Sequence, residues 1–235
     1  VEGTLFWQHI VSSASATYGV IHAQRGTAAL NSCDSLLPDY HGWAVHDCWA
    51  SYFEYPSCRH ALCGAHLLRE LTAVAEQGSR WARQMHTLLL RLYRHSQFGT
   101  HCVSYPQRWH QVYDMVCSRA QREEPPPIRH HRTGKATRTK GRNLLDRLIK
   151  YKQAVLAFAL YAEVPFTNNQ AERDLRPVKV KHKIAGCFRT LLGAQHYARI
   201  SSFISTARKQ HRHVFKELRQ IFQGDSFLIQ PVGAK

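Results

Sequence analysis

Apolar positions follow two different periods along the chain, and they predict strands first and helices afterwards. LFWQHIVSS (5–13) and TYGVIHAQ (17–24) are rich in aromatic and β-branched residues and are separated by a short Ala/Ser turn, which is typical of paired strands. GWAVHD (42–47) and RHALC (59–63) are short apolar runs. Such runs predict buried strands, and the acid that ends the first run is expected at a sheet edge.

Beyond the second run the apolar spacing becomes helical. We predict helices over these stretches: 66–78, 81–92, 109–117, 143–161, 197–209 and 213–222. The apolar stripes on these helices indicate core positions rather than cofactor contacts. In the last helix, five side chains are expected to point inward: Val214, Phe215, Leu218, Ile221 and Phe222. Pro177 is expected to kink the helix around it or to make it restart. Strands followed by helices predict an α/β fold with a helical insertion.

Charge gives the first indication of a partner. The chain has 32 Lys and Arg against 16 Asp and Glu, a net charge of +16. Nucleic acid is the commonest partner of such a basic chain, because lysines and arginines that neutralise phosphates release counterions. Simple solubility is the alternative explanation. The basic loop 122–142 is predicted to be either a solvated linker or a contact to the DNA backbone.

The compartment is predicted from two absences. The chain has seven cysteines, an odd number without a regular framework, which indicates reduced thiols in the cytoplasm. Its longest apolar run, 154–162, is well short of the roughly 18 residues that span a bilayer, so no membrane partner is expected. In a bacterial cell the protein is expected to associate with the nucleoid.

Two clusters carry candidate chemistry. Cys58, His60, Cys63 and His66 form a CxHxxCxxH pattern whose spacing suits zinc, although no second distant pair follows. The stretch FTNNQAERDLR (166–176) contains Glu172, three residues after an asparagine. This spacing fits a helix-capping box, and it also fits one corner of a metal site.

Three stretches are informative when they are compared with known families as a set: HDCWASY, HALCGAHLLREL and PFTNNQAERDLRPVKVKHKIAGCFRT. They closely resemble the transposases of the insertion-sequence-66 family, and the similarity extends over essentially the whole chain. That family belongs to the DDE transposases, whose catalytic domain is RNase H-like and binds two divalent ions, Mg²⁺ or Mn²⁺, through three carboxylates. The resemblance implies that Asp47 is the second acid and Glu172 the third. Cys63 and His66 resemble a CxxH element whose histidine lies near the scissile phosphate; a structural histidine at a helix start is the alternative.

The resemblance also implies a layout and partners. Residues 1–66 would begin the RNase H-like core, 67–142 would form a helical insertion, and 143–235 would carry the third acid and the C-terminal helices. The family's first acid would precede Val1, so the chain is expected to begin inside a longer protein. The DNA backbone would be held by basic residues after the third acid: Arg173, Arg176, Lys179, Lys181, Lys183 and Arg189.

Two functions follow from this resemblance. The first is metal-dependent cleavage and strand transfer of insertion-sequence ends, with transposon ends and target DNA as partners, as a homo-oligomer and with accessory transposition proteins. The second is an inactive, truncated relic that acts only as a basic DNA-binding domain.

Overall fold

The computed structural model describes residues 1, 3–32, 35–97, 102–127 and 137–225, and it divides the chain into two compact units. Unit 1 combines Val1–Tyr40 with Asn169–Lys235, and unit 2 is His41–Asn168. Unit 2 is therefore an insertion in the chain of unit 1. The resemblance implied a different division, into three consecutive segments (1–66, 67–142 and 143–235), and that division stays a prediction.

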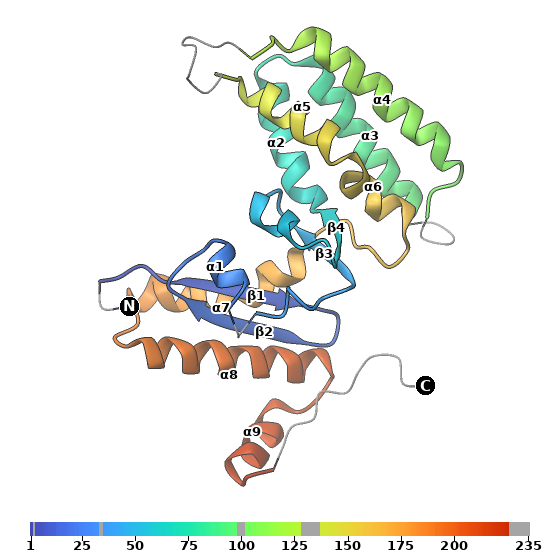
Figure 1. Ribbon diagram of the computed structural model, residues 1–235. Coiled ribbons are helices and arrows are strands. Elements are labelled where there is room, and N and C mark those ends of the chain that lie inside the picture. The colour runs from blue at the N-terminus through green and yellow to red at the C-terminus, as the bar shows by residue number, and fades with distance from the viewer. Residues whose placement is uncertain (2, 33–34, 98–101, 128–136, 226–235) are drawn as a thin grey trace. The chain divides into compact units, whose positions relative to one another are not determined.

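Unit 1 is a β-hairpin packed against two long helices (Figure 1). Strands β1 (Trp7–Ser12) and β2 (Thr17–His22) pair antiparallel, as predicted. The helices of this unit are α1 (Thr27–Leu30), α7 (Asn169–Ala185), α8 (Leu191–Lys209) and α9 (Val214–Phe222). Helix α7 contacts β1, and α8 contacts β2.

Small side chains explain how closely α8 approaches the hairpin. The buried face of α8 repeats every four residues, which places its members on one side of a helix: Ala194, Ala198, Ser202 and Thr206. Opposite them on β2 is Gly19, where an added Cβ would lie 2.9 Å from the Ser202 hydroxyl. A side chain at this position would require the Ser202 hydroxyl to move, so Gly19 favours the close approach of α8.

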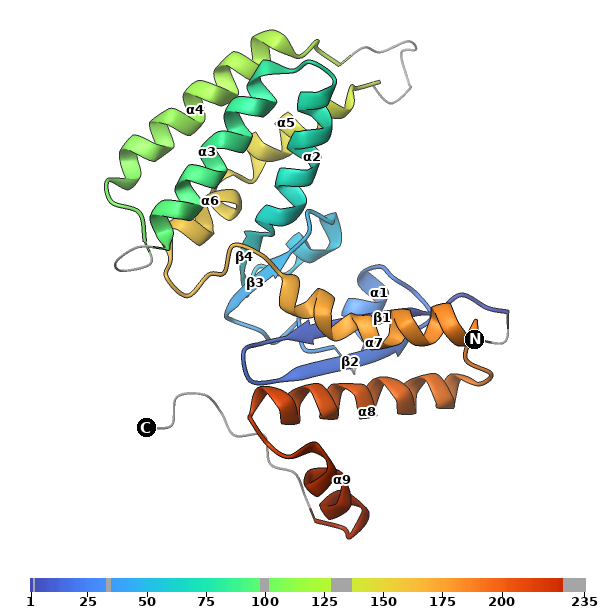
Figure 2. The ribbon, with the colours of Figure 1, turned by 180° about the vertical axis from the view of Figure 1, so that it is seen from behind.

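In its described residues, unit 2 combines a parallel pair of strands with a group of helices (Figure 2). Strands β3 (Trp43–His46) and β4 (Arg59–Leu62) are connected through the 3₁₀ helix Ala50–Glu54. The helices are α2 (Gly64–Glu76), α3 (Arg80–Ser96), α4 (Pro106–Glu123), α5 (Lys140–Lys150) and α6 (Lys152–Leu160). Gly78, just after α2, has a φ of +99°, the left-handed conformation common after a helix end.

The core of unit 2 is apolar and is built from the predicted stripes. Fully buried side chains come from α3, α4, α5 and α6: Trp81, Met85, Leu89, Leu92, Tyr113, Leu144, Leu145, Leu148 and Val155. The polar groups of these side chains are paired: the Trp81 indole N–H donates to the Glu124 carboxylate at 2.8 Å. The Tyr113 hydroxyl donates a hydrogen bond to the Leu148 carbonyl at 2.9 Å. This bond satisfies a polar atom that would otherwise be costly to bury.

Three helix predictions need correction. The predicted helix 143–161 is two helices, because Tyr151 between them has non-helical backbone angles (φ −109°, ψ 28°). Helix α7 continues through Pro177, so of the two predicted effects the restart is wrong and the kink stays a prediction. In α9 the inward-facing prediction was wrong: Phe215 is 79% exposed and Phe222 is 89% exposed. The prediction fails for Phe215, Ile221 and Phe222, whereas Val214 and Leu218 are half-buried. A helical period predicts an apolar face, but burial also needs a partner that covers it.

The fold is therefore mixed α/β, with mostly helical residues and two small sheets in the described part of the chain. Among those residues no helix is both long and apolar enough to cross a membrane. Within the predicted basic loop 122–142, residues 128–136 lie outside the described residues.

Candidate functional site

Two residues of the predicted catalytic site, Asp47 and His66, follow the ends of the parallel strands β3 and β4. His46, the last residue of β3, lies opposite Leu62, the last residue of β4, and the Cys63 N–H donates to the His46 carbonyl at 2.9 Å. The chain therefore leaves both strands at the same edge, at Asp47 and at Cys63. Because carboxyl ends of parallel strands share one edge, this is where ligands of α/β folds commonly bind.

Helix α2 begins directly after this edge and places His66 in its first turn. Its entry is tight: the Gly64 N–H donates to the Phe166 carbonyl at 2.7 Å, and a Cβ on Gly64 would lie 2.1 Å from the Phe166 ring. Only glycine fits there without moving the ring, which itself stacks on Tyr93 at 4.3 Å. The structure thus brings Asp47 and His66 to one edge of unit 2.

Asp47 is half-buried, and its Oδ1 accepts a hydrogen bond from the Trp49 N–H at 3.3 Å. The preceding His46 is buried, with 6% exposed. Burial lowers the pKa of His46 to about 4, although a hydrogen bond to the Asp47 carbonyl opposes the shift; the charge of His60 lowers the pKa further. His46 is therefore neutral near pH 7 and adds no positive charge beside the Asp47 carboxylate.

The cysteine and histidine cluster is not arranged as a zinc site. His60 Nδ1 lies 3.0 Å from His46 Nε2, and its Nε2 lies 3.7 Å from Cys58 Sγ and 3.1 Å from the Tyr55 carbonyl. Among the residues that the structure describes, no group of three or more His, Cys, Asp or Glu side chains could hold a metal ion. The hydrogen bonds of the two histidine rings instead join β3 to β4.

Helix α7 presents the other predicted acid. Glu172 lies in its first turn and is half-buried. Two residues further on, the Asp174 side chain is only 6% exposed. Four side chains donate hydrogen bonds to its carboxylate at 2.6 to 2.8 Å: Ser12, Thr17, Ser205 and Lys209. Asp174 thereby ties the start of α7 to the hairpin and to α8.

The Asp174 carboxylate is held in its charged form. Burial by itself raises the pKa of this group, but the hydrogen bonds from Lys209, Ser12, Ser205 and Thr17 outweigh burial and lower the pKa to about 2. The Lys209 ammonium also donates to the carbonyls of Ser13 and Ala16, both at 2.9 Å. Sequence analysis missed this network because its members are up to 197 residues apart and follow no motif.

The predicted DNA-binding residues are spread along α7 from Arg173 onward, except Arg189, which follows the helix. All of them are exposed except Lys181, which is half-buried: Arg173, Arg176, Lys179, Lys181, Lys183 and Arg189. Arg173, Arg176 and Lys181 border a shallow groove of about 570 Å³ between α7 and α8. Val180 and Ile184, which also line it, are 53% and 80% exposed. The charges are therefore available to a polyanion.

A family comparison decides what these residues belong to. The model of the transposase IS66 family matches residues 1–196. The chain belongs to this family. The IS66 match includes Asp47, His66, Glu172 and every predicted DNA-binding residue, and it connects the protein with the transposition of insertion sequences. No curated protein and no solved structure matches the chain.

The two units each carry a part of the predicted site of this IS66 transposase. Unit 2 places Asp47 and His66 at the edge of the parallel strands. Unit 1 places Glu172 and all the predicted basic residues except Arg189 on α7. Membership in the family and the positions within each unit are thus established, whereas the joint action of Asp47 with Glu172 is part of the proposal below.

Proposed function

We propose that the chain forms the RNase H-like catalytic domain of a DNA transposase that cleaves insertion-sequence ends and joins them to target DNA. The observation that carries the proposal is the edge of β3 and β4, where a chain of the IS66 family places an acid and a histidine at the carboxyl ends of parallel strands. Three further features support it: a second acid in the first turn of α7, exposed basic residues beyond it, and a net charge of +16.

The donor set fits magnesium. Mg²⁺ prefers hard oxygen ligands, and proteins usually bind it through one or two carboxylates together with waters and substrate phosphates. Asp47 and Glu172 are half-buried carboxylates, so both can present oxygen to an ion and still admit a phosphate. When bound, a pair of such ions activates the attacking oxygen and stabilises the leaving oxygen of a phosphodiester.

The remaining residues bind and orient DNA. His66, in the first turn of α2, would donate a hydrogen bond to a phosphate oxygen. Arg173 and Arg176 would bind neighbouring phosphates without reading bases. Contacts to the DNA backbone fix the position of the protein on the duplex but do not distinguish one base sequence from another. Asp174 acts through Glu172: by fixing the start of α7 it limits the directions in which the Glu172 carboxylate can point.

Two conservative substitutions in the full-length transposase test the proposal. Asp47→Asn and Glu172→Gln should each reduce Mg²⁺-dependent strand transfer by at least about 100-fold, the scale of losing one preorganised electrostatic group. Binding of element ends, measured by fluorescence anisotropy, should stay within about twofold, because the basic residues that hold phosphates are unchanged.

Matched controls are available among exposed acids. Asp114 is 60% exposed and pairs with Lys152, and Glu163 accepts a hydrogen bond from Trp43. Asp114→Asn and Glu163→Gln should retain strand transfer. Normal transfer by either site variant would remove that residue from the catalytic site. A wild-type protein that binds ends but transfers no strand would support the DNA-binding relic instead.

A further inference from the structure

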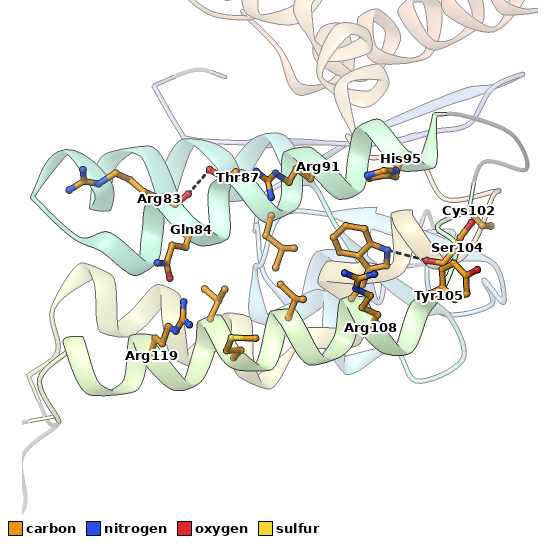
Figure 3. Close-up of a pocket in the computed structure, with 15 residues that line it drawn as sticks. Arg83, Gln84, Thr87, Arg91, His95, Cys102, Ser104, Tyr105, Arg108 and Arg119 are labelled. Carbon is orange, nitrogen blue, oxygen red and sulfur yellow. Dashed lines mark hydrogen bonds between the residues drawn. The ribbon is translucent and has the colours of Figure 1, made fainter.

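Unit 2 contains a groove that the proposed chemistry does not use. It runs between α3 and α4, has a volume of about 1240 Å³ and is shown in Figure 3. Its lining comes from the two helices and from the segment before α4: Arg83, Gln84, Thr87, Leu88, Arg91, His95, Cys102, Ser104, Tyr105, Arg108, Trp109, Val112, Met115, Val116 and Arg119.

The floor of the groove is apolar. Leu88 and Val116 are buried at its base, Trp109 and Val112 are half-buried, and Met115 is 47% exposed. The Trp109 indole N–H donates to the Ser104 carbonyl at 3.1 Å, which fixes the ring at one end of the groove. An exposed apolar strip of this kind gains free energy when a partner covers it, at about 25 cal/mol per Å² buried.

The rims of the groove are positively charged. Arg83 and Arg91 project from α3, and Arg108 and Arg119 project from α4, so that arginines border the floor on both sides (Figure 3). Arg83 also donates to the Gly78 and Ser79 carbonyls, which holds it at one end. No residue that lines the groove in the described part of the chain is acidic. The charge of the rims therefore calls for an acidic partner.

The length of the groove fits a short helix. Arg83 and His95, at its two ends on α3, are separated by about 18 Å at a rise of about 1.5 Å per residue. A partner helix of three to four turns matches this length, and its apolar residues at helical spacing would lie on the floor. Acidic residues on both flanks of that helix would then face the arginines of α3 and α4.

We propose that this groove binds an amphipathic, acid-flanked helix of a partner protein. A DNA duplex fits less well, because its surface offers phosphates to the arginines but nothing apolar to cover Trp109, Val112 and Met115. A second copy of this chain is also a poor match, since the chain carries 32 basic residues against 16 acidic ones. The inference uses neither Asp47 nor Glu172, so it stands or falls separately from the proposed reaction.

A display library of random 16-residue peptides tests the class of partner. The library is selected on the full chain after depletion on Met115→Glu, which places a charge on the floor. Because Met115 is 47% exposed, this variant is expected to keep the fold, and circular dichroism checks it. Enriched sequences should combine apolar residues at i, i+3, i+4 and i+7 with Asp or Glu on the flanks.

The strongest peptide from the selection is then measured by fluorescence anisotropy. Its affinity should fall at least tenfold with Met115→Glu and with the pair Arg91→Glu and Arg119→Glu. Ile149→Glu, at a 39% exposed position on α5 outside the groove, should leave affinity unchanged. Replacing every acid of the peptide by lysine should abolish binding.

Three results would overturn the inference. The first is a selection that enriches no acid-flanked helical sequence. The second is a peptide whose affinity is the same for Met115→Glu and for wild type. The third is a 30-base-pair duplex that binds through Arg91 and Arg119 and displaces the peptide, which would make the groove a nucleic-acid site.

Discussion

The two units of this transposase are stabilised in different ways. Unit 2 has a continuous apolar core, formed by large side chains such as Trp81 and Leu89. In unit 1 the contact of the hairpin with α7 and α8 is made by small and polar side chains around the Asp174–Lys209 ion pair. An apolar core tolerates substitutions that change side-chain volume only slightly. A buried ion pair is strongly destabilised when either partner is removed.

This difference affects the proposed site. Asp47 follows β3, and His66 lies in the helix that follows β4; both strands pack on the apolar core of unit 2. Glu172 stands two residues from Asp174, in a helix held by hydrogen bonds. We therefore expect a single polar substitution in unit 1 to disturb its half of the site more than a single apolar truncation disturbs unit 2.

The largest effect is expected from Asp174→Ala. Removing one member of a buried ion pair leaves the other charge unpaired, which costs about 3–5 kcal/mol. The side chains of Lys209 and Asp174 are only 9% and 6% exposed, so solvent offers little compensation. Hydrogen exchange of the β1, β2 and α8 amides should accelerate while that of α3 stays unchanged.

An exposed pair provides the control for this prediction. Asp114→Ala removes the partner of Lys152, but Asp114 is 60% exposed, and such pairs contribute about 0–1 kcal/mol. The double change Asp174→Leu with Lys209→Met should be less damaging than Asp174→Ala, because it leaves no charge buried. Equal exchange in Asp174→Ala and wild type would show that the ion pair does not hold unit 1 together.

A smaller effect is expected from truncating the apolar core of unit 2. Val155 is fully buried on α6, and Val155→Ala should lower the free energy of unfolding of this unit by about 2 kcal/mol through lost burial and a small cavity. Val180→Ala, at a 53% exposed position, should have almost no effect. Denaturant unfolding followed by the fluorescence of Trp81 measures the change. A loss above that of Asp174→Ala would reverse the comparison of the two units.

The smallest effect concerns thiol chemistry and leaves stability untouched. Burial raises the pKa of Cys117 in unit 2 to about 12, and the nearby Asp114 raises it as well. Cys187 in unit 1 is exposed. Because the thiolate is the reactive form, iodoacetamide at pH 8 should alkylate Cys187 long before Cys117, as mass spectrometry of the native protein would show. Equal rates would mean that the core of unit 2 opens readily.

The sequence predicted most elements because local periodicity determines them. Alternating and helical apolar patterns identified the hairpin, β3, β4 and the core stripes of α3 and α5, all of which the structure confirms. The break at Tyr151 escaped prediction because the apolar pattern continues across it. The exposed face of α9 escaped because periodicity does not identify the partner that covers a face.

Site prediction depended on a different kind of information. Asp47 could be placed at a strand end from its apolar run, but its role came from resemblance to a family, which the IS66 match confirms at the level of the family. The Asp174–Lys209 pair and the α3–α4 groove carry no local signal, because each is assembled from segments distant in sequence. Both became visible only when the folded chain brought these segments together.

In the proposed catalytic site, Asp47 and Glu172 bind the same divalent ions. This shared binding is tested by replacing Mg²⁺ with Fe²⁺ in the full-length protein and adding ascorbate and peroxide, so that radicals cut the backbone beside the bound ion. If both acids hold the ions, cuts appear near residue 47 and near residue 172, and Asp47→Asn removes both. Cuts near 172 that persist in Asp47→Asn, or cuts near only one of the two acids, would contradict shared binding.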